Sequence, residues 1–176
     1  MSEIKNREVP VLKIENLTVQ YVSDGVVSEA VTHVSLEVNK GETLGLVGET
    51  GAGKTTTALA CLRLIPSPPG NVKTGTVYIN DRDIYSLDQK ALEKVRGKEV
   101  AMIFQDPLSV LNPVHTIGAQ LEESIRLHEK CSKKEAQKRA GEMLEMVGID
   151  PERMHDYPHQ FSGGMKQRVV IAIALS

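Results

Sequence analysis

A glycine-rich segment of eight residues has the composition and spacing needed to bind phosphate. It fits the pattern G-x-x-x-x-G-K-[ST] at every position and reads Gly48, Glu49, Thr50, Gly51, Ala52, Gly53, Lys54 and Thr55. Glycines let the backbone curl so that successive N–H groups point at an anion, and the dipole of a following helix adds to their effect. The segment therefore predicts a phosphate-binding loop, or P-loop.

The residues around this loop predict the strand–loop–helix context that a P-loop requires. An apolar run at 43–47 precedes it and predicts a buried strand, and residues 56–62 predict a helix that Thr56 begins. Lys54 would reach the β- and γ-phosphates, and the Thr55 hydroxyl would coordinate Mg²⁺. The alternative is a tight glycine turn between a strand and a helix, but the Lys-Thr pair favours binding of a nucleoside triphosphate.

Three further features are candidates for a nucleotide site. Gln105 follows an apolar run at 100–104 that predicts a second buried strand, and its amide could ligate Mg²⁺ and orient a water molecule. Ser162, Gly163 and Gly164 precede a predicted helix that continues through Leu175, which suits either a helix cap or a phosphate contact. Tyr21, at the end of the first predicted strand, could stack on adenine or be structural.

The periodicity of the remaining chain predicts two kinds of structure. Alternating residues at 11–21 and 30–38 predict half-buried antiparallel strands joined by a turn at 23–25, and 75–79 predicts another strand. Ser132 and Glu135 match a capping box, which predicts a helix with a buried stripe that ends at Gly148. That stripe consists of Ala136, Ala140, Met143, Leu144 and Val147.

Bulk composition limits the classes of protein. The 176 residues, 40% of them hydrophobic, suit one globular domain, and a net charge of −2 gives no electrostatic footprint for nucleic acid. Cys61 and Cys131 lack metal-ligand spacing and are expected to be reduced thiols. The longest apolar run, 169–175, is far shorter than the ~20 residues of a membrane-spanning helix.

Together these motifs resemble the nucleotide-binding domain of ABC transporters, with the P-loop as Walker A, Gln105 as the Q-loop and Ser162–Gly164 as the signature motif. The stretches 102–113 and 157–165 are similar to the ATP-binding subunits of oligopeptide, dipeptide and nickel importers. Most of the wider family has Leu and Gln where this chain has Phe161 and Met165, whereas those importers commonly have Phe and Met.

The resemblance implies an α/β fold: a P-loop NTPase core of ABC type, with an antiparallel β subdomain, a partial RecA-like core and an α-helical subdomain. Residues 1–176 would form a single nucleotide-binding domain, incomplete at its C-terminal end. Residues 1–106 would hold the β subdomain and P-loop core, 107–160 the helical subdomain, and 161–176 the signature motif and its helix.

The resemblance also implies the ligands and partners. ATP and Mg²⁺ would be bound by the P-loop of one subunit and the signature motif, Met165 included, of a second subunit in a head-to-tail dimer. Lys54 and Gln105 would have supporting catalytic roles, and Thr55 and Gln105 would contact the metal. The helical subdomain would dock on membrane permease subunits, at the cytoplasmic face of the membrane.

In the family, the catalytic Glu, the Asp that supports Mg²⁺ and the switch His follow the signature helix, beyond Ser176 of this chain. We therefore expect a fragment that binds Mg-ATP with little turnover, and an apolar helix at 169–175 that lacks part of its packing surface. Two alternatives are a non-transport ABC-type ATPase and a naturally truncated nucleotide-sensing module.

Overall fold

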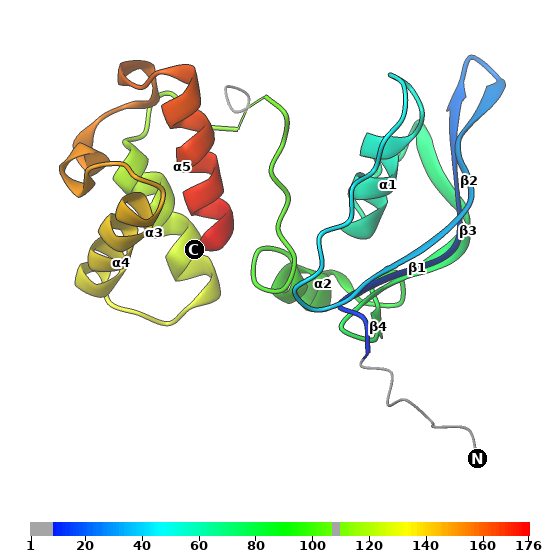
Figure 1. The fold of residues 1–176 in the computed structure, drawn as a ribbon, viewed down its shortest axis with the longest axis horizontal. Coiled ribbons are helices and arrows are strands. Elements are labelled where there is room, and N and C mark those ends of the chain that lie inside the picture. The colour runs from blue at the N-terminus through cyan, green and yellow to red at the C-terminus, as the bar shows by residue number, and fades with distance from the viewer. Residues whose placement is uncertain (1–8, 107–109) are drawn as a thin grey trace. The chain divides into compact units, whose positions relative to one another are not determined.

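The computed structural model describes residues 9–106 and 110–176. Residues 107–109, part of the stretch that carries the narrower resemblance, lie outside the described residues. The chain divides into two compact units, Met1–Glu93 and Lys94–Ser176, and each is described by itself (Figure 1). Within the described ranges, no helix is long and apolar enough to cross a membrane.

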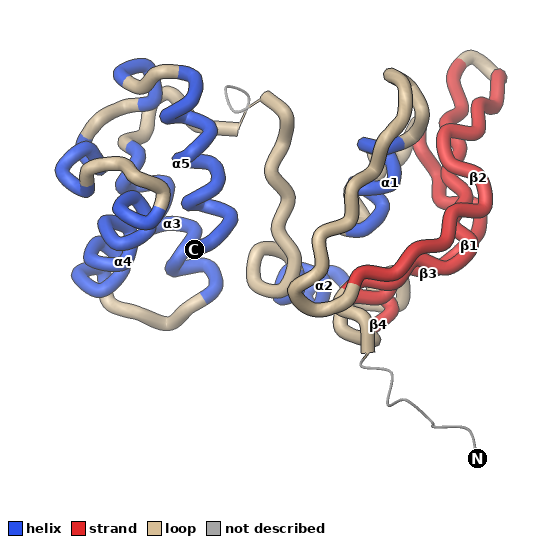
Figure 2. The backbone as a smooth tube through the Cα atoms, viewed as in Figure 1, coloured by secondary structure: helices blue, strands red, loops and turns tan. Residues whose placement is uncertain are grey.

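The first unit is built on an antiparallel sheet with the strand order β2-β1-β3-β4 in the described residues (Figure 2). Its strands are β1 (Leu12–Ser23), β2 (Val26–Val38), β3 (Gly70–Ile79) and β4 (Arg82–Asp83). Helix α1 (Lys54–Cys61) lies in the same unit, and α2 (Gln89–Val95) begins there. The predicted antiparallel strands and their turn are confirmed, with β2 and β3 starting earlier than their periodicity indicated.

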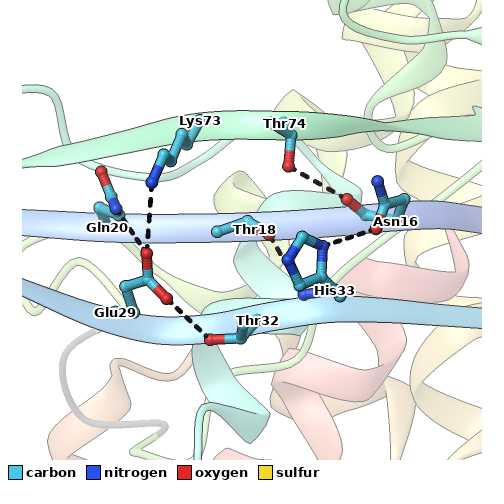
Figure 3. Close-up of polar contacts among 8 residues, drawn as sticks. All are labelled: Asn16, Thr18, Gln20, Glu29, Thr32, His33, Lys73 and Thr74. Atoms are coloured by element: carbon cyan, nitrogen blue, oxygen red, sulfur yellow. Dashed lines mark hydrogen bonds and ion pairs between the residues drawn. The ribbon is translucent and has the colours of Figure 1, made fainter.

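Side chains on β1, β2 and β3 crosslink the sheet by hydrogen bonds (Figure 3). The Glu29 carboxylate on β2 accepts from Gln20 Nε2 at 2.7 Å and pairs with Lys73 Nζ at 3.4 Å. The Gln20 hydrogen bond, followed by Lys73, lowers the pKa of the Glu29 carboxyl. Farther along the strands, Asn16 Oδ1 lies 2.7 Å from His33 Nδ1. These contacts connect three strands that are distant in sequence, and so they help to fix the register of the sheet.

The second unit is helical. It contains α3 (Ile117–His128), α4 (Lys133–Met146), the short 3-10 helices η2 (Pro151–His155) and η3 (Pro158–Gln160), and α5 (Gly163–Leu175). The capping box at the start of α4 is confirmed: Glu135 N–H donates to Ser132 Oγ, and Ser132 N–H donates to the Glu135 carboxylate. Gly148, which follows α4, has a left-handed φ of 70°, as expected of a helix stop.

The core of the helical unit explains why α5 is well packed. Val169, Val170 and Ala172 are buried with residues of α3 and α4, including Leu121 and Leu144. These three residues are buried, whereas Ile171, Ile173 and Ala174 are half-buried, so the expectation that the 169–175 helix lacks part of its packing surface stays a prediction. Its apolar side chains find partners inside the helical unit itself, although Leu175 stays 57% exposed.

The two predicted buried strands are also wrong. Residues 43–47 and 101–104 are irregular, and Val47 and Phe104 are exposed (Figure 2). An apolar run becomes a strand when neighbouring strands accept its backbone hydrogen bonds. In the described residues, the sheet contains the strands β1, β2, β3 and β4 and no others. The run at 100–104 makes only one isolated bridge, between Arg96 and Val100.

The two cysteines differ in environment. Cys61, in α1, is buried, and its Sγ lies 3.3 Å from the Thr57 carbonyl oxygen, whereas Cys131 is half-buried. Burial raises the pKa of Cys61 to about 11 and that of the neighbouring Tyr85 to about 12. Because these pKa values are raised on folding, the stability that the neutral groups contribute is present below their ordinary values of 9.0 and 10.0, and it is lost as pH rises through about 11 and 12.

We expect iodoacetamide at pH 8 to alkylate Cys131 and to spare Cys61, whose thiolate fraction would be on the order of 0.1% because of its raised pKa. Mass spectrometry of the modified peptides measures both rates, and a sample unfolded in urea, in which both thiols are exposed, is the control. Equal rates at the two cysteines of the folded chain would contradict the buried position of Cys61.

Candidate phosphate-binding site

The P-loop connects β2 to α1 in the first unit. The segment that leads to it, residues 42–47, is irregular and exposed. Gly51 and Gly53 have φ angles of 87° and 81°, in the left-handed region that favours glycine. The remaining loop residues, Gly48, Glu49, Thr50 and Ala52, are exposed. The loop therefore bends where its glycines allow, and its surface is open to solvent.

Gly53 is fixed by a backbone contact with β2. A Cβ atom built on Gly53 would lie 2.2 Å from the carbonyl oxygen of Ala30 and 3.2 Å from a methyl group of Val31. A side chain at Gly53 is therefore excluded by the fold itself. Sequence analysis did not single out Ala30, because nothing in the local pattern of β2 indicates which residue of the loop packs on it.

The start of α1 is suited to an anion. Gly53 is the N-cap residue, so its position contributes no side chain that competes for the first N–H groups of the helix. Lys54 Nζ donates to the carbonyl oxygens of Gly48 at 2.7 Å and Glu49 at 2.6 Å, so its ammonium group bridges the two ends of the loop. A positive charge and a helix N-terminus thus converge on the same loop.

The three threonines that follow have different environments. Thr55 is exposed and Thr56 is half-buried. Thr57 is buried, and its hydroxyl donates to the Gly53 carbonyl oxygen at 3.0 Å. Thr55, next to Lys54, is therefore the most exposed of the three residues, and a hydroxyl oxygen is a hard ligand of the kind that Mg²⁺ prefers.

Tyr21 lies near the P-loop through the register of the sheet. On β1 it pairs with Ser28 of β2 and Gly70 of β3, and its half-buried ring packs against Gly70. Two residues earlier, Val19 pairs with Val31, which Gly53 contacts. Two residues of a strand span about 7 Å, so Tyr21 lies about that far along β1 from the residue that pairs with Val31.

The other predicted site residues belong to the helical unit. Gln105 lies at an exposed bend in the irregular segment. Ser162 is the N-cap of α5, and its Oγ accepts from Met165 N–H at 3.4 Å. Ser162, Gly163 and Gly164 are exposed. The Ser162 hydroxyl keeps its own proton for donation, so this helix start can offer a hydroxyl and backbone N–H groups to an acceptor.

The Met165 side chain is half-buried and turned toward Arg153, whose Nη1 lies 3.5 Å from the Met165 sulfur. This contact engages the sulfur within the helical unit. Within the first unit the structure groups the loop with Lys54 and Thr55, and within the second unit it groups Ser162 with Met165. Arg153 was missed by sequence analysis, because a single arginine between helices carries no recognisable pattern.

We expect Gly53→Ala to weaken nucleoside triphosphate binding by at least about tenfold, because the new Cβ would clash with the Ala30 carbonyl in addition to the ~1 kcal/mol of strain at a left-handed φ. Gly41→Ala is the matched control, since Gly41 has a φ of 76° and no described atom within 4 Å of its Cβ position. Equilibrium binding of a fluorescent nucleotide measures both variants. Equal losses would contradict the importance of the β2 contact.

Comparisons with known proteins agree with this geometry. Residues 31–176 match the family described as ABC transporter. The chain is 46% identical over 172 residues to the oligopeptide transport ATP-binding protein of Bacillus subtilis, covering 97% of this chain and 48% of the relative. It is also 46% identical to the dipeptide transport ATP-binding protein of that organism, covering 94% and 50%. The chain therefore spans about half the length of these curated relatives.

A solved structure of a dimeric ATP-binding cassette in a post-hydrolysis state, bound to ADP and Pi, matches with a TM-score of 0.81 at 29% identity and covers 93% of this chain and 68% of that one. A component of a bacterial ABC transporter complex from Clostridium perfringens matches with a TM-score of 0.74 at 23% identity, covering 96% and 62%, and supports the fold alone. On the family match, the loop and the fold, this chain belongs to the ABC transporter ATP-binding family.

Proposed function

We propose that this chain is the nucleotide-binding part of an ABC importer subunit that takes up oligopeptides or dipeptides. The P-loop would bind ATP through its N–H groups and Lys54. The peptide class is inferred from the relatives, whose names describe oligopeptide and dipeptide transport. The mixed charge of the chain, with a net value of −2, favours this reading over an ABC-type ATPase that acts on nucleic acid.

The observation that carries the proposal is a pair of glycines that the fold of the chain does not require. Apart from its chain neighbours and the nearby backbone of α5, a Cβ atom at Gly163 or Gly164 would meet nothing within 4 Å among the described residues, and neither glycine has a positive φ. Glycine in a helix costs up to about 1 kcal/mol relative to alanine. We infer from these glycines that a ligand or partner approaches the start of α5 closely.

A nucleotide held by the P-loop of a second subunit accounts for that close approach. The Ser162 hydroxyl and the N–H groups of Gly163 and Gly164 would donate to its phosphate oxygens, and each site would be completed by two subunits. Since ATP would then bind the paired state more tightly than the separated state, it would shift the equilibrium toward closure. Such closure would drive the attached permease, and hydrolysis would release it.

The available oxygen donors fit Mg²⁺. Thr55, the residue after Lys54, is exposed and carries a hydroxyl oxygen, and the Gln105 side-chain oxygen belongs to the same class of hard ligand. When bound, the ion would neutralise charge on the phosphates. Tyr21 would stack on adenine. We further propose that the helical subdomain, 107–160, docks on permease subunits, and that the assembly works at the cytoplasmic face of a membrane.

We expect Lys54→Ala to weaken Mg-ATP binding by at least about tenfold, because it removes a charged hydrogen-bond donor from the loop. Lys40→Ala, at an exposed lysine in the turn after β2, is the control and should bind as the unaltered chain does. Radiolabelled ATP measures bound nucleotide and released phosphate in one sample. Unchanged affinity in Lys54→Ala would contradict the assignment of the P-loop as the nucleotide-binding loop.

We expect Gly164→Ala to raise the melting temperature of the chain, by about 2–4 °C for each kcal/mol gained, and yet to weaken ATP-dependent association. The matched control is Gly141→Ala in α4, whose Cβ would meet Pro151 at an ordinary 3.5 Å. That variant should be stabilised with unchanged association. Analytical ultracentrifugation with and without Mg-ATP separates the two effects, and undiminished association in Gly164→Ala would argue against the partner contact.

A further inference from the structure

Arg153, in the short 3-10 helix η2, makes contacts through every part of its guanidinium group. Its Nε donates to Asp156 Oδ2 at 2.8 Å, and Nη2 donates to the Gln160 carbonyl oxygen at 3.1 Å. Nη1 lies 3.5 Å from the Met165 sulfur, and the guanidinium carbon lies 4.3 Å from the centre of the Phe161 ring. Each guanidinium nitrogen thus has its own partner, and an aromatic ring covers the group.

The η2 turn that carries Arg153 is anchored to α3. Ile117 N–H, in the first turn of α3, donates to the Asp156 carbonyl oxygen at 2.9 Å. Gly118 packs so closely that a Cβ there would lie 2.8 Å from the Met154 carbonyl oxygen. Because Ile117 and Gly118 are buried, this anchor is part of the helical core. The η2 turn that carries Arg153 is therefore held in place by α3.

The groups that Arg153 holds lie on both sides of Ser162. Gln160 and Phe161 precede it, and Met165 is in the first turn of α5. Phe161 is 4% exposed and belongs to the core of the helical unit, so its ring orientation is fixed by packing as well as by the guanidinium. The Arg153 side chain thus contacts residues on both sides of the exposed Ser162–Gly164 segment at the start of α5.

The same contacts involve Phe161 and Met165, the two positions at which this chain differs from the Leu and Gln of most of the wider family. A phenylalanine offers a π face to a cation, which leucine does not. A methionine side chain is flexible and ends near a polarisable sulfur, so it can bring that sulfur into contact with the guanidinium group. In this chain, both side chains contact Arg153. The hydrogen-bond donors at the exposed start of α5 are then the Ser162 hydroxyl and the N–H groups of Gly163 and Gly164.

We propose that Arg153 is a positioning residue for the signature motif: it holds Ser162, Gly163 and Gly164 in the geometry that receives the phosphates of a nucleotide bound by a partner subunit. The partner contact rests on the function proposed above, whereas the support of the helix start is a property of this chain alone. The role requires the planar fork of arginine, because lysine presents a single ammonium group that cannot reach three separated acceptors in fixed directions.

The test compares Arg153→Lys with Arg139→Lys. Arg139 pairs with Glu129 on the surface of the same unit, so the control makes the same arginine-to-lysine change at an ion pair elsewhere. Hydrogen exchange followed by NMR reports the amides of Phe161 and Met165, which donate to the Pro158 carbonyl and to Ser162 Oγ, against amides of α4. Association with Mg-ATP and ATP binding by the single chain are measured on the same samples.

We expect Arg153→Lys to speed exchange at Phe161 and Met165 by about tenfold, as loss of hydrogen bonds from a charged group implies, with α4 unchanged. ATP-dependent association should weaken by a similar factor, while ATP binding by the single chain stays within about twofold of its original value because Lys54 is untouched. Phe161→Leu, which keeps an apolar core residue, should loosen the same amides to a smaller extent.

Three results would overturn the proposal: unchanged exchange and association in Arg153→Lys, equal loosening of α4, or the same losses in Arg139→Lys. Failure of the proposed function gives a different pattern. In that case, the unaltered chain would not bind or associate with Mg-ATP, and the exchange data would still decide whether Arg153 holds the start of α5.

Discussion

The contact between the backbones of Gly53 and Ala30 is the constraint on which the phosphate site depends. It places the start of α1 against β2, and β2 is held by its ladder to β1 and by polar side chains such as Glu29. Backbone N–H groups bind phosphate well because they are fixed before the anion arrives and because no Cβ blocks the approach. The antiparallel sheet is therefore the platform that gives the P-loop its shape.

The start of α5 also presents free backbone N–H groups, as the start of α1 does, but different contacts hold it in place. At α1 the N-cap is Gly53, in a left-handed conformation against a sheet, and at α5 it is Ser162, at the edge of a helical core. The first start is positioned by backbone packing and the second by Arg153. Each helix start offers donors to an anion, and two such surfaces in one polypeptide suit a site that two subunits complete.

Local chemistry made several elements predictable. The Ser132–Glu135 capping box, the Gly148 stop and the buried stripe of α4 agree with the structure, because each depends on residues within a turn or two of one helix. The buried strands at 43–47 and 100–104 were wrong, because an apolar run records a tendency to be buried but not the neighbouring strand that must accept its hydrogen bonds.

By itself, the sequence determined the chemical groups of the site: the glycine spacing of the P-loop, Lys54, Thr55 and the Ser-Gly-Gly start of α5. Tertiary structure decided what holds them. Gly53 meets Ala30, and Arg153 meets Phe161 and the Met165 sulfur, through contacts between residues that are not neighbours in a strand or helix. Local periodicity describes which face of an element is apolar, whereas the partner of that face is set by how the chain folds back on itself.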